Sequence, residues 1–367
     1  MPKTNNFDLI RLAAAMQVAI THVIAHFIPA SRDSGVLGFI ELFPGVPIFF
    51  FISGFLISKS YEKNPDLREY GFNRFLRIYP GLAVCFCMSL ITVWLTGYFA
   101  TVTVALSELL LWVLAQLTAF QFYNPVWLRQ YGVGVLNGSM WTITVELQFY
   151  MLVPIVYVLL RGARATKRRT NGVLLALAFV FWVINRLCLA ETAQYAHALW
   201  FKLLDVSFLP WFYMFLVGVL FQKNFEVLSR WLAGKFVYAL MGYCALAIIG
   251  TRLLGWNVGN ALNVVLFLAL AVATFSAAFS CNWLSDKTLR RNDLSYGVYI
   301  YHMPVANTLL AVGLGGRAIG FPCAIFATLL CAYASWRLIE KPALHLKRHP
   351  LYQHDRQGDA RAVVVNS

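Results

Sequence analysis

Arg11 and His22 are the residues whose types and spacing point most directly to chemistry. They lie eleven residues apart in FDLIRLAAAMQVAITHVIAHF, an otherwise apolar segment long enough to cross a bilayer, where ionisable side chains are costly and usually functional. Eleven helical residues rise about 16 Å and make close to three turns, so both side chains project from one face. We expect that face to line a cavity. A histidine that only hydrogen-bonds between helices is an equally open interpretation.

Glu146 is the second candidate, in the segment NGSMWTITVELQFYMLVP. It lies about two turns inside an apolar stretch, with Trp141 near its mouth and Tyr150 one turn further on. We expect His22 to be its partner, because the first helix runs outward and the fourth inward, which places both groups in the outer half of the membrane. A carboxylate and an imidazole in contact can share a proton and suit general acid–base catalysis. A glutamate that only ties two helices together is the alternative.

Arg74 and Arg77 form a third group, in FNRFLRIYPG at the cytoplasmic end of a predicted span. Residues three apart share a helical face, and two guanidiniums form a fork that binds phosphate groups. A coenzyme A diphosphate would fit there. Basic residues also flank membrane spans and bind anionic headgroups, which is the competing interpretation.

Composition indicates the elements that must position these groups. Of the 367 residues, 60% are hydrophobic and only 13% are charged, which is typical of an all-α polytopic membrane protein. No cleavage site follows the first apolar segment, so we expect that helix to be retained. The seven cysteines form no CxxC pair and fit small core residues, and no metal site is predicted. We predict spanning helices near 7–28, 38–58, 78–98, 140–160, 172–190, 205–222, 236–254, 261–280, 294–313 and 319–339.

Basic residues orient these helices. With ten spans and a cytoplasmic N-terminus, 24 of the 30 lysines and arginines fall on the cytoplasmic side, as the positive-inside rule requires. If the apolar segment 104–122 crossed the membrane, the orientation of every later helix and loop would be inverted, against this rule. We therefore predict that the segment is re-entrant or packed at the outer surface. The net charge of +14 is spread over short loops and indicates no nucleic-acid partner. We expect a membrane domain at 1–344 and a polar cytoplasmic tail at 345–367.

The chain as a whole resembles the acyltransferase family 3 membrane proteins. Supporting motifs are FPGVPIFFFISGFLIS at 43–58, SYGVYIYHMP at 295–304 and IEKPA at 339–343. The resemblance matches Arg11 and His22 to the family's arginine–histidine motif, Arg74 and Arg77 to R-x-x-R, Trp141, Glu146 and Tyr150 to W-x-x-x-x-E-x-x-x-Y, Ser53 and Gly54 to a serine–glycine pair, and Tyr299 and His302 to a late tyrosine–histidine pair.

This resemblance implies transfer of an acyl group from cytoplasmic acyl-CoA to a hydroxyl of an O-antigen, exopolysaccharide or lipo-oligosaccharide. We expect acetyl-CoA as the donor substrate, no tightly bound cofactor, and a carbohydrate acceptor, free or lipid-linked, at the bacterial inner membrane. The chain is similar to stand-alone members, which lack a C-terminal SGNH hydrolase-like domain. Acyl chain, acceptor and oligomeric state stay open.

The resemblance and the spacing together assign roles to these residues. His22 acts as the base or transient acyl carrier, with Glu146 setting its tautomer and charge. Arg11 orients or polarises the thioester. Arg74 and Arg77 bind the donor, and the expected substrate contacts are Trp141, Tyr150 and His302.

Two other classes compete with this interpretation. A transporter or flippase would use His22 and Glu146 as a proton relay, but inverted repeats are not evident in the sequence. A polysaccharide polymerase or ligase would use a lipid-linked sugar donor and ignore acyl-CoA.

Overall fold

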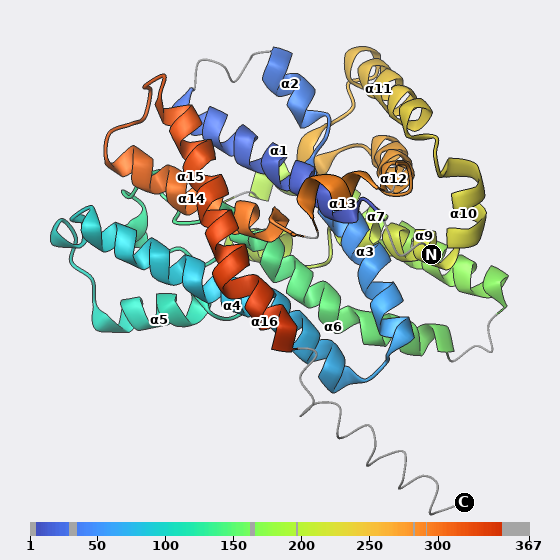
Figure 1. The fold of residues 1–367 in the computed structure, drawn as a ribbon, viewed down its shortest axis with the longest axis horizontal. Helices are drawn as coiled ribbons and strands as arrows, with labels where there is room; N and C mark the ends of the chain where they lie inside the picture. Colours follow the sequence, from blue (N-terminus) through green and yellow to red (C-terminus); the bar gives the residue numbers. More distant parts are fainter. Residues whose placement is uncertain are drawn as a thin grey trace, which may run out of the picture.

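The computed structural model describes residues 5–28, 35–161, 166–195, 197–281, 283–290 and 292–346, and these contain helices and loops but no strand (Figure 1). Beyond Leu346, the predicted polar tail at 345–367 lies outside the described residues. The principal helices are α1 (Phe7–Phe27), α2 (Gly35–Glu41), α3 (Gly45–Lys63), α4 (Leu67–Leu95), α5 (Leu106–Gln116), α6 (Trp141–Arg161), α7 (Lys167–Tyr195), α8 (Leu199–Asp205), α9 (Phe212–Lys223), α10 (Phe225–Leu232), α11 (Phe236–Leu253), α12 (Val264–Ala278), α13 (Leu284–Leu289), α14 (Ser295–Ala311), α15 (Gly320–Ser335) and α16 (Lys341–His345).

The helices confirm a polytopic all-α membrane protein. Among the described residues, seven helical segments are long and apolar enough to cross a membrane, and each corresponds to a predicted span. The other three predicted spans correspond to the shorter helices α9, α12 and α14, of 12, 15 and 17 residues.

The predicted helix at 205–222 starts later than expected, because α8 ends at Asp205 and the chain turns before α9 begins at Phe212. Pro210 lies in that turn, where its missing N–H costs no helical hydrogen bond.

Helix α4 begins eleven residues before the predicted start at 78. Asp66 caps it, since its Oδ1 accepts a hydrogen bond from the Glu69 N–H at 2.7 Å. The helix continues past Pro80 to Leu95. Arg74 and Arg77 therefore lie on the spanning helix itself and are carried into the bundle.

The segment predicted to be re-entrant or surface-packed, 104–122, contains only the eleven-residue helix α5. Such a helix rises about 16 Å, well short of the roughly 30 Å hydrocarbon core. Trp112 of α5 is fully buried and packs edge-on against Phe86 of α4, with ring centroids 5.1 Å apart. This segment is thus held against α4 by aromatic packing.

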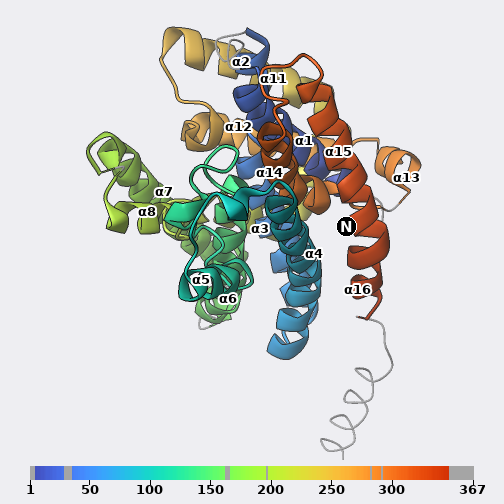
Figure 2. The same cartoon turned by 90° about the vertical axis from the view of Figure 1, so that its left-hand side faces the viewer.

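Helices α1, α3 and α14 form the centre of the bundle. α1 packs against both α3 and α14, α9 packs against α3 and α7, and α15 covers α14 (Figures 1 and 2). The crossing of α3 and α9 is tight. A Cβ on Gly54 would lie 2.0 Å from the Phe215 carbonyl oxygen, and one on Gly218 would lie 2.1 Å from that of Phe51. Small residues allow this close backbone approach, as is common between membrane helices.

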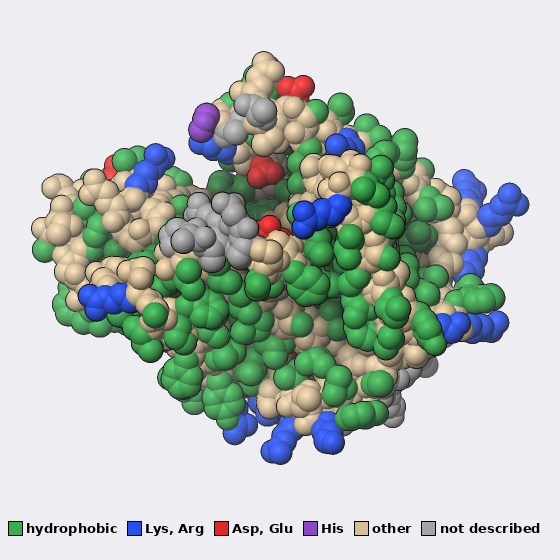
Figure 3. Space-filling model, turned by 90° about the horizontal axis from the view of Figure 1, so that it is seen from above, with side chains coloured by type: hydrophobic (Ala, Val, Ile, Leu, Met, Phe, Trp, Pro, Cys, Tyr) green, Lys and Arg blue, Asp and Glu red, His purple; other side chains and the backbone are tan. Residues whose placement is uncertain are grey.

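The outer surface is largely apolar. Figure 3 shows hydrophobic side chains over much of one face, with lysines and arginines at separate points, many of them along its edge. Large exposed hydrophobic side chains occur on several helices, including Trp94, Phe179, Met241 and Phe326. Such extensive apolar exposure is not tolerated in water and fits contact with lipid.

We predict that Gly54→Ala and Gly218→Ala each lower the free energy of unfolding of the detergent-purified protein by about 1–3 kcal/mol, because the added methyl group overlaps a backbone carbonyl. Gly242→Ala in α11 is the matched control, since nothing lies within 4 Å of a Cβ at that position. Equal melting temperatures for all three variants would contradict the tight crossing.

Candidate active site

Three elements distant in sequence meet around one carboxylate. Asp293, just before α14, accepts a hydrogen bond from Nη2 of Arg77 on α4 at 2.5 Å, and its Oδ2 lies 3.7 Å from Nη1 of Arg11 on α1. The side chains of Arg11, Arg77 and Asp293 are 18%, 15% and 10% exposed. Burial alone would raise the pKa of Asp293, but the two guanidiniums and hydrogen bonds from Ser295 together lower it below its usual value. Asp293 is therefore a carboxylate at ordinary pH.

Glu146 of α6 is held by two hydroxyl groups. Its Oε1 accepts hydrogen bonds from Ser53 Oγ of α3 at 2.8 Å and from the Tyr150 hydroxyl at 2.6 Å. Tyr150 reaches it because residues four apart on a helix lie one above the other. The guanidinium of Arg74 lies over the Tyr150 and Tyr70 rings, 5.6 Å and 5.8 Å from their centroids. Ser53 and Tyr150 thus fix the direction of the Glu146 carboxylate.

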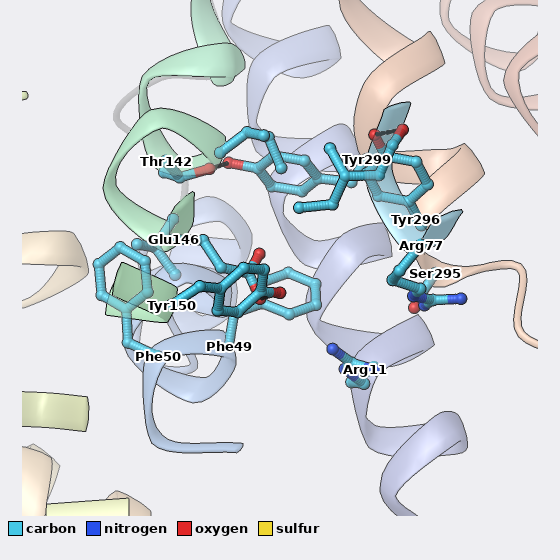
Figure 4. A pocket seen from close by; sticks show the side chains of 13 residues that line it. Arg11, Phe49, Phe50, Arg77, Thr142, Glu146, Tyr150, Ser295, Tyr296 and Tyr299 are labelled. Carbon is cyan, nitrogen blue, oxygen red and sulfur yellow. Dashed lines mark hydrogen bonds between the residues drawn. The ribbon is translucent and has the colours of Figure 1, made fainter. Parts of the chain in front are cut away.

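A pocket connects these two groups. In Figure 4, Arg11 lies at one end, the hydroxyls of Thr142 and Tyr299 meet at the other, and Glu146 and Tyr150 lie between them. Its full lining is Arg11, Val46, Phe49, Phe50, Arg77, Ile78, Thr142, Ile143, Glu146, Tyr150, Ser295, Tyr296 and Tyr299. The Nε atom of Arg11 is buried without a hydrogen-bond partner among the described residues, as is that of Arg74. Such donors suit an anionic ligand.

His22 belongs to a separate polar group. Its Nδ1 lies 3.0 Å from Nε2 of His302, and the Ser139 Oγ lies 3.4 Å from the former atom and 3.1 Å from the latter. Ser139 is positioned by a short turn before α6, in which Asn137 accepts a hydrogen bond from the Ser139 N–H and donates one to the Ile300 carbonyl of α14.

The boundary between the pocket and the histidines is formed by Thr142 and Tyr299. Their hydroxyl oxygens are 2.6 Å apart, and each lies 3.1 Å from the Ser139 carbonyl oxygen. Thr142 and Tyr299 line the pocket, whereas Ser139 contacts both histidines. A short hydrogen-bonded layer therefore separates the arginine-lined pocket from the histidine pair.

The predicted pairing of His22 with Glu146 is wrong. Glu146 shares its pocket with Arg11, whereas His22 lies about 16 Å further along α1 and meets His302 and Ser139. Counting residues from the predicted helix ends places both groups in the outer half of the membrane. The packing of α6 against α3 instead places Glu146 in the lining of the pocket that Arg11 also lines.

Arg74 and Arg77 have different contacts in the structure, unlike the fork predicted from the sequence. Arg77 forms an ion pair with Asp293 and lies over the Tyr296 ring, while Arg74 lies against Tyr70 and Tyr150. The two guanidiniums share a helix but have different surroundings.

The remaining predicted substrate contacts occupy distinct places. Tyr150 lines the pocket, and His302 is fully buried beside His22. Trp141 lies outside the pocket lining and packs against Trp211, with ring centroids 5.2 Å apart.

Sequence reasoning missed Asp293, Ser139 and Thr142. The sequence could have indicated Asp293 as a site residue, because it is a single acidic residue in RRNDLSYG, directly before an apolar helix. It could not have indicated Ser139 or Thr142, since hydroxyl residues are common near helix starts.

Comparison with known proteins assigns the family. The acyltransferase domain of the acyltransferase 3 family matches residues 4–337. The chain belongs to this family. It is 35% identical over 356 residues to nodulation protein 10 of Rhizobium leguminosarum bv. viciae, covering 94% of each chain. It is 24% identical over 363 residues to an O-acetyl transferase of Shigella phage Sf6, covering 93% of this chain and 96% of that one. No solved structure matches the chain significantly.

This acyltransferase is therefore a multi-pass membrane enzyme of the O-acyltransferase class. The resemblance drawn from the motifs is confirmed over nearly the whole chain. The carrier and polymerase alternatives are not supported by these relatives.

We predict that Asp293→Asn destabilises the acyltransferase by about 1–3 kcal/mol, because Arg11 and Arg77 lose their counter-charge inside the bundle. The stability difference from wild type should be constant between about pH 5 and 8, because the lowered pKa of Asp293 keeps the wild-type carboxylate charged throughout that range, and it should shrink only at more acid pH, where the carboxylate is protonated. Thermal unfolding measured from about pH 8 down into the acid range below about pH 5 tests both points.

Glu191→Gln is the control for this experiment, because it makes the same chemical change at an exposed position on α7. An Asp293→Asn protein as stable as Glu191→Gln would contradict the structural importance of the ion pair.

Proposed function

We propose that the enzyme transfers an acyl group, acetyl in the first instance, from cytoplasmic acyl-CoA to a hydroxyl of an exported or cell-surface carbohydrate. The observation that carries this proposal is the pair of polar sites stacked along α1. One is an arginine-lined pocket suited to an anionic donor, and the other is a histidine pair suited to proton transfer. The relative named as an O-acetyl transferase supports acetyl as the group transferred.

The donor is proposed to enter at the arginine end. Arg74 and Arg77 would contact its phosphate groups, and the unpaired Nε donors of Arg11 and Arg74 support an anion there. Arg77 already neutralises Asp293, so it would share its charge between that carboxylate and the donor. Arg11 lines the same pocket and is placed to polarise the thioester carbonyl.

The chemistry would take place where the pocket meets the histidine pair. His22 removes the proton from the acceptor hydroxyl, the hydroxyl oxygen attacks the thioester carbon, and the carbon–sulfur bond breaks. The CoA thiolate then takes up the proton, which leaves an ester and free CoA. The layer formed by Thr142 and Tyr299 lies on this path, so the acyl end of the donor must pass it to reach His22.

The location follows from the charge distribution. Basic residues favour a cytoplasmic position for both termini. Arg11 lies in the second turn of α1, so this orientation places the arginine pocket toward the cytoplasm, where acyl-CoA is made. We propose the bacterial inner membrane as the site of action, with membrane lipids and a free or lipid-linked carbohydrate as partners.

The first experiment follows release of free CoA from acetyl-CoA by the protein in nanodiscs, with glycan fractions of the source cells as acceptor and labelled acetyl as tracer. CoA release with transfer of label to glycan supports the proposal. Folded protein that neither binds nor consumes acetyl-CoA or longer acyl-CoA donors would overturn it.

We predict that His22→Ala lowers turnover by about 10²–10⁴-fold, because proton transfer in the transition state is lost. Binding of acetyl-CoA, measured by calorimetry, should change little, since His22 is not part of the pocket lining. His197→Ala, at an exposed position before α8, is the control and should retain full turnover. Near-normal turnover of a folded His22→Ala protein would refute the assignment.

We predict that Glu146→Gln lowers turnover by at least tenfold with little loss of thermal stability. The amide oxygen can still accept hydrogen bonds from Ser53 and Tyr150, but the negative charge in the pocket is removed. Turnover equal to wild type would show that Glu146 serves packing alone.

A further inference from the structure

His302 has a defined hydrogen-bonding state in this structure. Its side chain is fully buried, and its Nδ1 lies 3.2 Å from the Val298 carbonyl oxygen. A carbonyl oxygen can only accept a hydrogen bond, so Nδ1 of His302 must carry a hydrogen. In the neutral ring, Nε2 of His302 then holds a lone pair.

That lone pair faces His22. The distance between His302 Nε2 and His22 Nδ1 is 3.0 Å. Two lone pairs at this separation would repel each other, so His22 Nδ1 must carry a hydrogen and donate it to His302. Neutral His22 then has its lone pair on Nε2, the ring nitrogen that does not contact His302.

Ser139 is compatible with the same assignment. Its hydroxyl group lies 3.1 Å from His302 Nε2 and 3.4 Å from His22 Nδ1. A hydroxyl can donate to the former atom while accepting from the latter. The opposite tautomer of His22 would leave the lone pairs of both histidines pointing at each other, with a single hydroxyl hydrogen to satisfy them.

We propose that His302 is a positioning residue, which holds His22 as the tautomer whose Nε2 is free to take a proton from the acceptor hydroxyl. This inference rests on the proposed function of His22 for its catalytic meaning, but the tautomer itself follows from the contacts. His302 takes the place that sequence reasoning gave to Glu146, whose carboxylate is engaged by Ser53 and Tyr150.

The chain of hydrogen bonds also determines where the proton can go. When His22 Nε2 takes the hydroxyl proton, the positive charge of the ring is shared through the Nδ1–H to His302 Nε2. The Val298 carbonyl beyond His302 cannot accept a proton, so the relay ends there. The proton stays on the histidine pair until it is returned to the CoA thiolate, and the two histidines are unchanged after one turnover.

The direct test is solid-state NMR of the protein in lipid bilayers with ¹⁵N-labelled histidine side chains. The His22 signals are assigned by their loss in His22→Gln. The proposal expects a protonated Nδ1 and an unprotonated Nε2 for His22 near neutral pH, without substrate. An unprotonated Nδ1 in the wild-type protein would overturn it.

Two variants connect the tautomer to turnover. His302→Phe removes the acceptor while keeping a ring, so His22 should become a mixture of tautomers and kcat should fall by about 10- to 100-fold with little change in KM for acetyl-CoA. His302→Gln keeps an acceptor at the position of Nε2 and should restore the Nδ1–H tautomer and most of kcat.

The outcomes separate this inference from the proposed function. Equal kcat and an unchanged His22 tautomer in His302→Phe would refute the role of His302. The expected tautomer together with absence of acyl-CoA consumption would refute the transferase proposal and leave the tautomer assignment intact. If His302→Phe fails to fold, the wild-type spectrum still tests the tautomer, and loss of the Nδ1–H tautomer in a folded His302→Gln protein with full kcat would refute the role of His302.

Discussion

The ion cluster at Asp293 sets the register of the central helices. The Asp293 carboxylate lies between Arg77 and Arg11, so these three ionised groups can remain inside the bundle. Because α1 and α14 are joined at Arg11 and Asp293 and run in the same direction, residues at similar distances beyond these points reach similar depths. His22 lies eleven residues beyond Arg11, and His302 lies nine beyond Asp293. The contact between the histidines follows from this anchoring.

The same arrangement produces a site with two ends. Glu146 and the arginines face a pocket, and the histidines lie beyond the hydroxyl layer formed by Thr142 and Tyr299. In the proposed reaction the donor would occupy the arginine-lined pocket, and the acceptor hydroxyl would meet the histidine pair beyond the hydroxyl layer.

Much of this could be predicted from the sequence. The helical class, the apolar helices and the shared face of Arg11 and His22 follow from composition and from the 3.6-residue period of one helix. The distribution of charge alone predicts that 104–122 does not span the membrane, which agrees with the eleven-residue length of α5. The partner of His22 was not predictable, because it depends on how deeply Glu146 and His302 sit on helices that are far apart in sequence.

The sequence by itself determined which side chains share a helix face and which segments are apolar enough to enter a membrane, since both depend on local spacing and on transfer from water. The tertiary structure alone decided that Asp293 neutralises two arginines, that Ser53 and Tyr150 hold Glu146, and that His302 contacts His22. These contacts depend on helix starts, lengths and crossings. A shift of one turn moves a side chain by about 5 Å, which is enough to exchange one hydrogen-bond partner for another.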